Sequence, residues 1–168
     1  LGYRIGHAYA QFLSKSSASD ATLKVVVGHD IRLSSPQISD ALIEGLLDGG
    51  LDVQHIGECG TEEIYFATSH FKMDGGIVVT ASHNPKDYNG MKLVREDSRP
   101  ISGDTGLKEI EKLAEANEFP PVTNRGQLTT LDHQSAYIER LLGYVDSSSL
   151  KPLKIVVNPG NGGAGAVI

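Results

Sequence analysis

The chain has 168 residues, a formal net charge of −6 and 39% hydrophobic residues, which predicts one domain with at most a piece of a second. No apolar run approaches the ~20 residues of a transmembrane helix, and residues 1–13 lack the basic start of a signal peptide, so no membrane partner is expected. The acidic balance without a Lys/Arg cluster argues against nucleic acid as a partner. The single cysteine, Cys59, excludes an internal disulfide and fits a reducing cytoplasm, where we expect it to be a small buried residue. Because the first residue is Leu1, we expect a cut or processed N-terminus.

The first half of the chain alternates patterns typical of helices and of short strands. The predicted strands are rich in β-branched residues, as in "LKVVVG" and "GGIVVT", whereas the predicted helices carry an apolar stripe. In chain order these ranges are 3–14, 23–28, 36–48, 51–57, 61–71 and 75–80, with a polar loop over 14–22 after the first helix. This order predicts a mostly parallel sheet with helices on its faces.

The segment "TASHNPKDYNGMKLV" (80–94) interrupts this alternation. A further apolar run, "MKLV" (91–94), follows the third strand with no helix between them. A return this short must be antiparallel, since a parallel crossover needs a dozen or more residues, and Asn89-Gly90 suits a sharp reversal. The predicted fold is therefore a layered α/β/α domain whose mixed, mostly parallel, four-stranded sheet has an antiparallel last strand.

The second half of the chain predicts further helices and the start of a second unit. The segments are a helix over 102–118, a loop over 119–131, a helix over 132–145, a linker over 146–152 and a strand over 153–158. "LKIVVN" repeats the pattern of "LKVVVG", and the glycine-rich "GNGGAG" (160–165) follows it. We therefore expect one domain over 1–147, then a linker and the cut-off start of a second, related domain over 148–168.

Three side chains are predicted to cap helices at their N-termini. Ser35 precedes Pro36, a residue favoured at the first helical position. Thr61 opens a segment with two glutamates in its first turn, where the helix dipole favours negative charge. Asp132 precedes the last predicted helix.

Polar side chains gather where two of the predicted strands end, and ligands of open α/β sheets bind beyond the carboxyl ends of the strands. Ser82 can serve there as nucleophile or phosphate carrier, His83 can move protons near neutral pH, and Lys92 can pair with a phosphate. Asp30 and Arg32 of "GHDIR" leave the first strand on the same edge, and Arg32 can offer a phosphate a fork of donors. The alternative is a turn-rich surface loop beside a local Asp30–Arg32 salt bridge.

Two other patterns have simpler interpretations. "GNGGAG" satisfies G-x-G-x-x-G, but a dinucleotide site would also need an acidic residue ~20 positions later, and this chain ends before that position. The alternative is a tight strand-to-helix turn needing positive φ. The remaining histidines show no metal-ligand spacing and receive no role: His7, His29, His55, His70 and His133.

The segment "GGIVVTASHNPKDYNGMKLV" closely resembles the phosphoserine signature of the α-D-phosphohexomutases. The resemblance extends through "GHDIRLSSP", "GTEEIYFAT" and "REDSRPISGDTGL" to "LKIVVNPGNGGAG", and so covers nearly the whole chain. In detail the chain looks most like the bacterial phosphomannomutase/phosphoglucomutase branch, whose phosphomannomutases supply mannose 1-phosphate for GDP-mannose and surface polysaccharides.

The resemblance implies four domains around a cleft, with this chain supplying the first. Ser82 would carry the phosphate, His83 would be a general acid or base, and Lys92 would contact the phosphoryl group or the sugar. Asn84, Arg32 and Asp30 would help to bind phosphate or substrate, whereas the arginine common in the family before this aspartate is a histidine here. A phosphoserine oxygen would bind Mg²⁺ together with three aspartates of a D-x-D-x-D-R loop that this sequence lacks.

In the implied reaction the phosphoserine converts a hexose phosphate to a hexose 1,6-bisphosphate, which reorients and returns its other phosphoryl group. We expect this chain alone to be inactive, because it supplies only the donor side of the reaction. Mannose, glucose and glucosamine phosphates remain alternative substrates, since the implied sugar-selecting loop has no counterpart here. The rival hypothesis is a non-catalytic phosphate- or nucleotide-binding α/β module that uses the glycine-rich turn.

Overall fold

The computed structural model describes residues 1–16, 21–160 and 162–166. Positions 17–20 of the expected polar loop, position 161 of the glycine-rich turn and positions 167–168 lie outside the described residues. None of the helices in the described part of the chain combines the length and apolarity that crossing a membrane requires.

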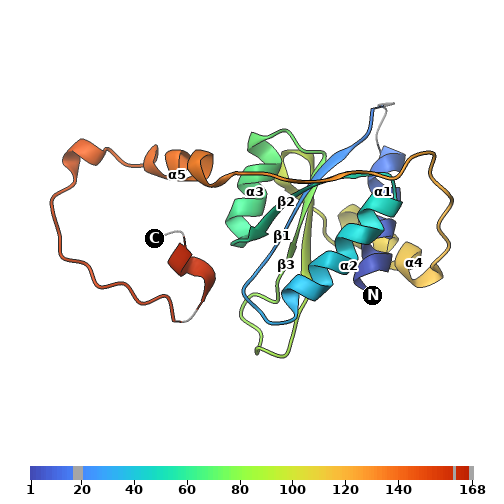
Figure 1. Cartoon of the computed structure of the whole chain (residues 1–168), viewed down its shortest axis with the longest axis horizontal. Helices are drawn as coiled ribbons and strands as arrows, with labels where there is room; N and C mark the ends of the chain where they lie inside the picture. The colour runs from blue at the N-terminus through green and yellow to red at the C-terminus, as the bar shows by residue number, and fades with distance from the viewer. Residues whose placement is uncertain (17–20, 161, 167–168) are drawn as a thin grey trace.

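A mixed, mostly parallel sheet forms the centre of the molecule (Figure 1). Its spatial order is β5-β4-β3-β1-β2-β6. The strands are β1 (Lys24–His29), β2 (Asp52–Glu58), β3 (Gly75–Val79), β4 (Met91–Arg95), β5 (Arg99–Pro100) and β6 (Leu128–Thr130). β1 pairs in parallel with both β2 and β3, whereas β4 runs antiparallel to β3, with Val78 opposite Lys92. The antiparallel return predicted from the short loop is confirmed.

The sheet has six strands and not the predicted four. The two additional strands lie at its edges, β5 beside β4 and β6 in parallel beside β2. β6 falls within residues 119–131, which were predicted to be a loop. Strands of two or three residues are too short for a period-2 pattern, so the hydrogen bonds of the neighbouring strand define them rather than their own sequence.

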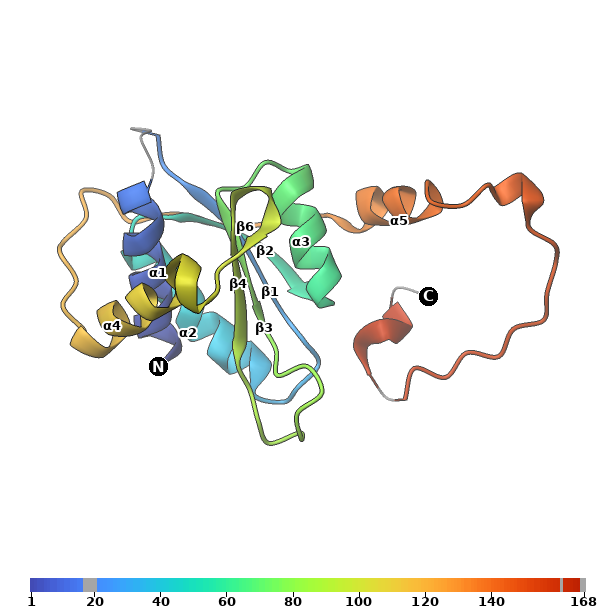
Figure 2. The same cartoon turned by 180° about the vertical axis from the view of Figure 1, so that it is seen from behind.

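Helices cover both faces of the sheet, as predicted. They are α1 (Gly2–Ser16), α2 (Ser35–Asp48), α3 (Thr61–His70), α4 (Lys108–Ala116) and α5 (Gln134–Leu142). Figures 1 and 2 show α1, α2 and α4 on one face and α3 on the other, with α5 beyond the α3 side. Two apolar clusters fill the layers, because successive residues of a strand point to opposite faces. Val25 and Val27 join the larger cluster under α1 and α2, whereas Val26 joins the smaller one under α3.

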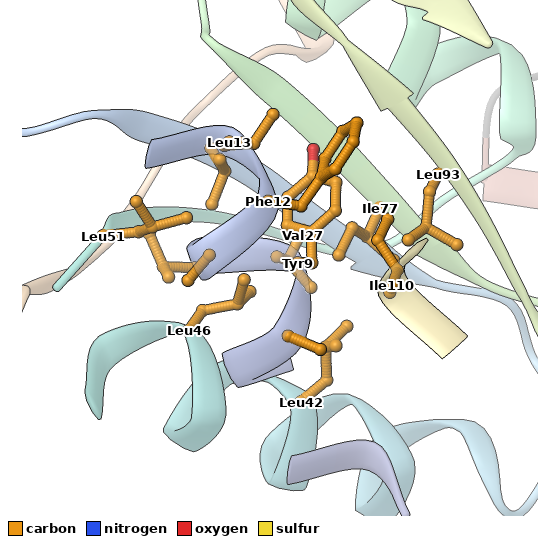
Figure 3. Close-up of a cluster of buried hydrophobic side chains, with 14 of the residues drawn as sticks. Tyr9, Phe12, Leu13, Val27, Leu42, Leu46, Leu51, Ile77, Leu93 and Ile110 are labelled. Carbon is orange, nitrogen blue, oxygen red and sulfur yellow. The ribbon is translucent and has the colours of Figure 1, made fainter. Parts of the chain in front are cut away.

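Figure 3 shows the larger cluster, in which Tyr9 and Leu42 from two helices meet Val27 and Ile77 of the sheet. Tyr9 is fully buried, and its hydroxyl donates a hydrogen bond of 2.6 Å to the carbonyl of Val94 in β4. Burial raises the pKa of this phenol far above its ordinary value, so it stays a neutral donor. Its polar group is therefore satisfied inside an apolar layer.

Two of the three predicted helix caps were wrong by one position. Ser34 rather than Ser35 occupies the N-cap of α2, and the hydroxyl of Ser35 donates to Asp30 instead. Gly60 caps α3, where its N–H donates to the Glu63 carboxylate at 2.7 Å. At α5 His133 occupies the N-cap position, but the carboxylate of Asp132 accepts a hydrogen bond from the N–H of Gln134 at 3.3 Å, as the prediction required. At α2 and α3 a hydrogen bond within the fold, or the local backbone geometry, outweighs the residue preference at the cap.

The helix predicted over 102–118 is interrupted. A π-helical turn covers Gly103–Leu107 and α4 follows from Lys108. Gly106 has a φ of 134°, and a Cβ there would lie 2.4 Å from the ring of Phe12. The break therefore lets the chain pass close to α1, which any other residue would obstruct.

The strand predicted over 153–158 does not form. Leu153, Ile155 and Val156 are 78%, 73% and 98% exposed, and no described strand hydrogen-bonds to them. A strand needs a paired neighbour for its N–H and C=O groups, so the apolar pattern alone was insufficient. The division of the chain at 147 stays a prediction.

Candidate active site

The predicted site lies at the carboxyl edge of the two central strands. β1 and β3 are parallel neighbours, so the chain leaves both of them at the same edge. The residues that follow β1 and the loop over 80–90 lie side by side at this edge in both views (Figures 1 and 2). We call residues 80–90 the Ser82 loop.

Ser82 is exposed and has a left-handed backbone, with a φ of 53°. Its Oγ lies 3.0 Å from Nδ1 of His83, within hydrogen-bond reach. Its N–H donates to Oγ1 of Thr80 at 3.0 Å. A non-glycine residue in the left-handed region is unfavourable by itself, so the surroundings must hold Ser82 in this conformation.

Asp30 accepts hydrogen bonds from both neighbouring segments. Its Oδ1 accepts from the Ser35 hydroxyl at 2.6 Å and from the Arg32 N–H at 3.1 Å. Its Oδ2 accepts from the Thr80 hydroxyl at 2.7 Å and from Nε of Arg32 at 3.1 Å. Burial by itself would raise the pKa of this carboxyl, but these donors, first Ser35 and Thr80, together hold the pKa below its ordinary value.

The side chain of Arg32 is only 13% exposed and lies against the Ser82 loop. Nη1 donates to the carbonyls of Pro85 and Tyr88 at 2.7 and 3.1 Å. Nη2 donates to the carbonyls of Ser82 and Asn84 at 2.9 and 2.7 Å. The guanidinium thus connects the β1–α2 segment to four backbone positions of the loop.

Two asparagines shape the loop further. The amide side chain of Asn84 donates to the carbonyl of Ala81 at 2.8 Å, beside the backbone bond between the same residues. Nδ2 of Asn89 lies 2.9 Å from the hydroxyl oxygens of both Ser34 and Ser35. The predicted turn residue Asn89 therefore also connects the loop to the start of α2.

Four of the six predicted site residues line one open cleft of about 700 Å³, namely Asp30, Arg32, Ser82 and Asn84. Exposed Ile31 and Leu33, together with Ser34, complete its β1–α2 side. Lys86 and Asp87 complete its loop side. His83 contacts Ser82 directly.

Lys92 is not among the residues that line this cleft, and it lies on β4 opposite Val78. Val78 belongs to the cluster under α3, and Nζ of Lys92 lies 3.5 Å from Oγ1 of Thr61 at the start of that helix. The ammonium group therefore stands beside the N-terminus of α3, where the helix dipole also favours an anion.

The side chains that the structure describes do not build a metal site by themselves. Within the described ranges, no three His, Cys, Asp or Glu side chains gather so that they could hold a metal ion, and hard cations need several oxygen ligands. Cys59 is buried, as expected, and burial raises the pKa of its thiol to about 12. The thiol is therefore protonated and unreactive at neutral pH.

Sequence reasoning missed several polar residues of this edge. Thr80 was assigned only to the third strand, Ser35 to a cap, and Asn89 to a turn. Each lies within a few residues of the carboxyl end of a parallel strand, or at the start of the helix that follows one. That position is the signal that could have identified them.

Comparisons with known proteins point to one family. The family model described as "Phosphoglucomutase/phosphomannomutase, alpha/beta/alpha domain I" matches residues 1–121. A phosphomannomutase of Escherichia coli strain K12 is 54% identical over 170 residues, and a protein named "Phosphohexose mutases" from Xanthomonas campestris is 52% identical over 172. Both alignments cover 100% of this chain and 36% of the relative.

A solved structure shows the same fold. The crystal structure of a phosphoglucomutase/phosphomannomutase family protein from Burkholderia thailandensis matches with a TM-score of 0.83 and 34% identity, over 99% of this chain and 36% of that one. The chain thus spans about a third of the length of the relatives that it matches. From the family model that matches residues 1–121 and the solved structure with the same fold, the chain belongs to the phosphoglucomutase/phosphomannomutase family and contains the α/β/α domain I of that family.

Proposed function

We propose that the protein is a phosphohexomutase that interconverts mannose 6-phosphate and mannose 1-phosphate, with Ser82 as the phosphate carrier. The observation that carries the proposal is the exposed Ser82 hydroxyl, whose oxygen lies 3.0 Å from Nδ1 of His83. It stands on a loop that Arg32 holds by hydrogen bonds, at the carboxyl ends of the parallel strands β1 and β3. Family membership and 54% identity to a protein named phosphomannomutase support the reaction and the sugar. The rival phosphate- or nucleotide-binding module is disfavoured, because no described strand leads directly into the glycine-rich turn.

In the proposed first step a hydroxyl oxygen of the hexose phosphate attacks the phosphorus on Ser82. The bond from phosphorus to Oγ breaks, a bond to the sugar oxygen forms, and the hydroxyl proton passes from the sugar to a water molecule. Nδ1 of His83 is placed to deliver a proton to Oγ as it departs. The hexose 1,6-bisphosphate then turns around, and the reverse sequence at its other phosphate restores phospho-Ser82.

The remaining roles belong to the same proposal. A phosphoserine carries about −1.5 to −2 charges at pH 7, and Lys92 would offset part of the negative charge of the reacting phosphates. Asn84, Asp30 and Arg32 line the cleft in which the phosphate would be held. Mg²⁺ would take one oxygen of phospho-Ser82, and its other ligands would come from outside this chain. The 168-residue chain alone would be inactive, because reactants must be held in line by all walls of the site.

The direct test uses the full-length protein, incubated with a hexose 1,6-bisphosphate and analysed by intact mass and by turnover of mannose 6-phosphate. We expect one added phosphoryl group in the parent protein, and neither phosphorylation nor turnover in Ser82→Ala. Ser69→Ala, an exposed serine of α3, is the matched control and should behave like the parent. Near-parental turnover in Ser82→Ala would eliminate the covalent route.

Lys92 gives a second test. Lys92 is a half-buried residue of β4. Lys92→Ala therefore removes one positive charge without creating a cavity in the core, and the fold should persist. We expect kcat to fall by about ten- to a thousandfold, the range typical of losing one electrostatic contact to a transition state. Steady-state kinetics with mannose 6-phosphate measure this, and an unchanged kcat would remove Lys92 from the mechanism.

A further inference from the structure

The contacts of Arg32 are inconsistent with a free phosphate-binding side chain. A guanidinium has five N–H donors and no acceptor. Here Nε donates to Asp30, and the two terminal nitrogens donate to four carbonyls of the Ser82 loop. With five hydrogen bonds made, no donor remains for a phosphate unless one of these bonds breaks.

The four carbonyls belong to two consecutive turns. One is closed by the N–H of Asn84 on the carbonyl of Ala81, and the other by the N–H of Tyr88 on the carbonyl of Pro85, each at 3.0 Å. Arg32 contacts Ser82 and Asn84 on the first turn and Pro85 and Tyr88 on the second, so it fixes the angle between them. It also holds the carbonyl of Ser82, the residue with the left-handed backbone.

Asp30 in turn orients the guanidinium. It accepts from Nε of Arg32 and from the hydroxyl of Thr80, whose oxygen receives the N–H of Ser82. The peptide of Ser82 is therefore held from its N–H side through Thr80 and Asp30, and from its carbonyl side through Arg32. The Ser82 hydroxyl, whose hydrogen-bond partner is His83, remains exposed to the cleft.

We propose that Arg32 is a positioning residue: it clamps the carbonyls of the Ser82 loop, fixes the left-handed backbone of Ser82 and so aims the phosphate-carrying hydroxyl, and it does not bind the substrate phosphate. Lysine cannot replace it, because an ammonium is a point charge with three donors and cannot reach four carbonyls in a plane. The kinetic part of this inference rests on the proposed function, and the structural part does not.

The test compares the full-length parent protein with Arg32→Lys, which keeps the charge, and with Arg140→Lys on exposed α5 as the control. Hydrogen exchange of the backbone amides measures the loop. We expect the amides of Ser82, Asn84 and Tyr88 to exchange at least about tenfold faster in Arg32→Lys, while β1 and β3 keep their protection. The control should leave both regions unchanged.

Steady-state kinetics distinguish an Arg32 that positions the Ser82 loop from an Arg32 that binds the substrate phosphate. A misplaced hydroxyl should lower kcat by about a hundredfold, while the KM for mannose 6-phosphate stays within about twofold because no substrate contact is lost. A raised KM with parental kcat and intact loop protection would instead make Arg32 a phosphate ligand. Unchanged loop exchange, or loss of protection throughout β1 and β3, would each overturn the clamp. If the parent protein lacked mutase activity, the proposed function would fail, and the exchange result would still decide the clamp.

Discussion

Asp30 accepts hydrogen bonds from both the β1–α2 segment and the Ser82 loop. Its negative charge therefore makes the stability of the folded protein depend on pH. Its pKa is lower in the folded protein than in the unfolded chain, where it is ~3.9. Below that value the unfolded state binds the proton first, so the folded state loses this stabilisation as pH falls from ~4 through the folded pKa.

This predicts a pH-dependent difference between the parent chain and Asp30→Asn. At neutral pH the variant should be less stable by about 1–3 kcal/mol, since hydrogen bonds to a charged group are lost. The difference should shrink as pH falls below ~4, because the parent then also carries a neutral group. Urea unfolding at several pH values measures it, with exposed Asp104→Asn as the control. A difference that is constant from pH 7 to pH 3 would contradict the prediction.

At the scale of elements, glycines set the distance between α1 and α2. A Cβ on Gly45 of α2 would lie 2.0 Å from the carbonyl oxygen of Tyr3, and one on Gly6 of α1 would lie 2.3 Å from the carbonyl oxygen of Leu42. The backbones of the two helices therefore touch at this crossing. Any side chain there must push the helices apart, because a neighbouring backbone cannot rotate away as a side chain can.

Gly45→Ala should accordingly destabilise the chain, although alanine is the better helix former by about 1 kcal/mol. We expect a net loss of about 1–3 kcal/mol, typical of overpacking, in urea unfolding followed by circular dichroism. Gly143→Ala is the matched control: its new Cβ would meet nothing closer than 3.4 Å, so stability should be unchanged or slightly higher. Stabilisation by Gly45→Ala would show that the helices separate without loss of packing.

At the scale of the whole molecule, His133 is the last buried residue in the described part of the chain. Its Nε2 lies 2.7 Å from Oε2 of Glu63, and both side chains are nearly inaccessible, at 3% and 6%. No described residue after it is buried, α5 included. Figure 1 shows the chain after α5 leading away from the sheet in a wide loop and then turning back, so that Gly163 lies near Glu58 at the end of β2. The histidine that sequence patterns left without a role thus anchors the end of the compact part to α3.

Limited proteolysis of the 168-residue chain should reflect this distribution of burial. Exposed backbone with few hydrogen bonds is cut first, so we expect early cleavage within 146–152 and then trimming of 134–145. Residues before His133 should persist, with fragments identified by mass spectrometry. Early cleavage inside 23–95, with the linker intact, would contradict both the predicted boundary and the observed packing.

The sequence by itself determined the alternation of helices and strands, the antiparallel return and the edge of the sheet at which the candidate site residues gather. These features depend on local properties: β-branched runs, the position of glycine and proline, and a loop too short for a parallel crossover. The loop that carries Ser82 could be identified for the same reason, because its residues are contiguous.

Only the tertiary structure decided what Arg32 does and where the sheet ends. The partners of Arg32 in the Ser82 loop lie 50 to 56 residues away in sequence, so an arginine that looks free for a phosphate becomes a clamp on carbonyls. β6 likewise exists only through its pairing with β2, and the apolar run over 153–158 forms no strand without such a neighbour. Hydrogen bonds between distant segments have no local signal, because they depend on which backbone groups the folded chain brings together.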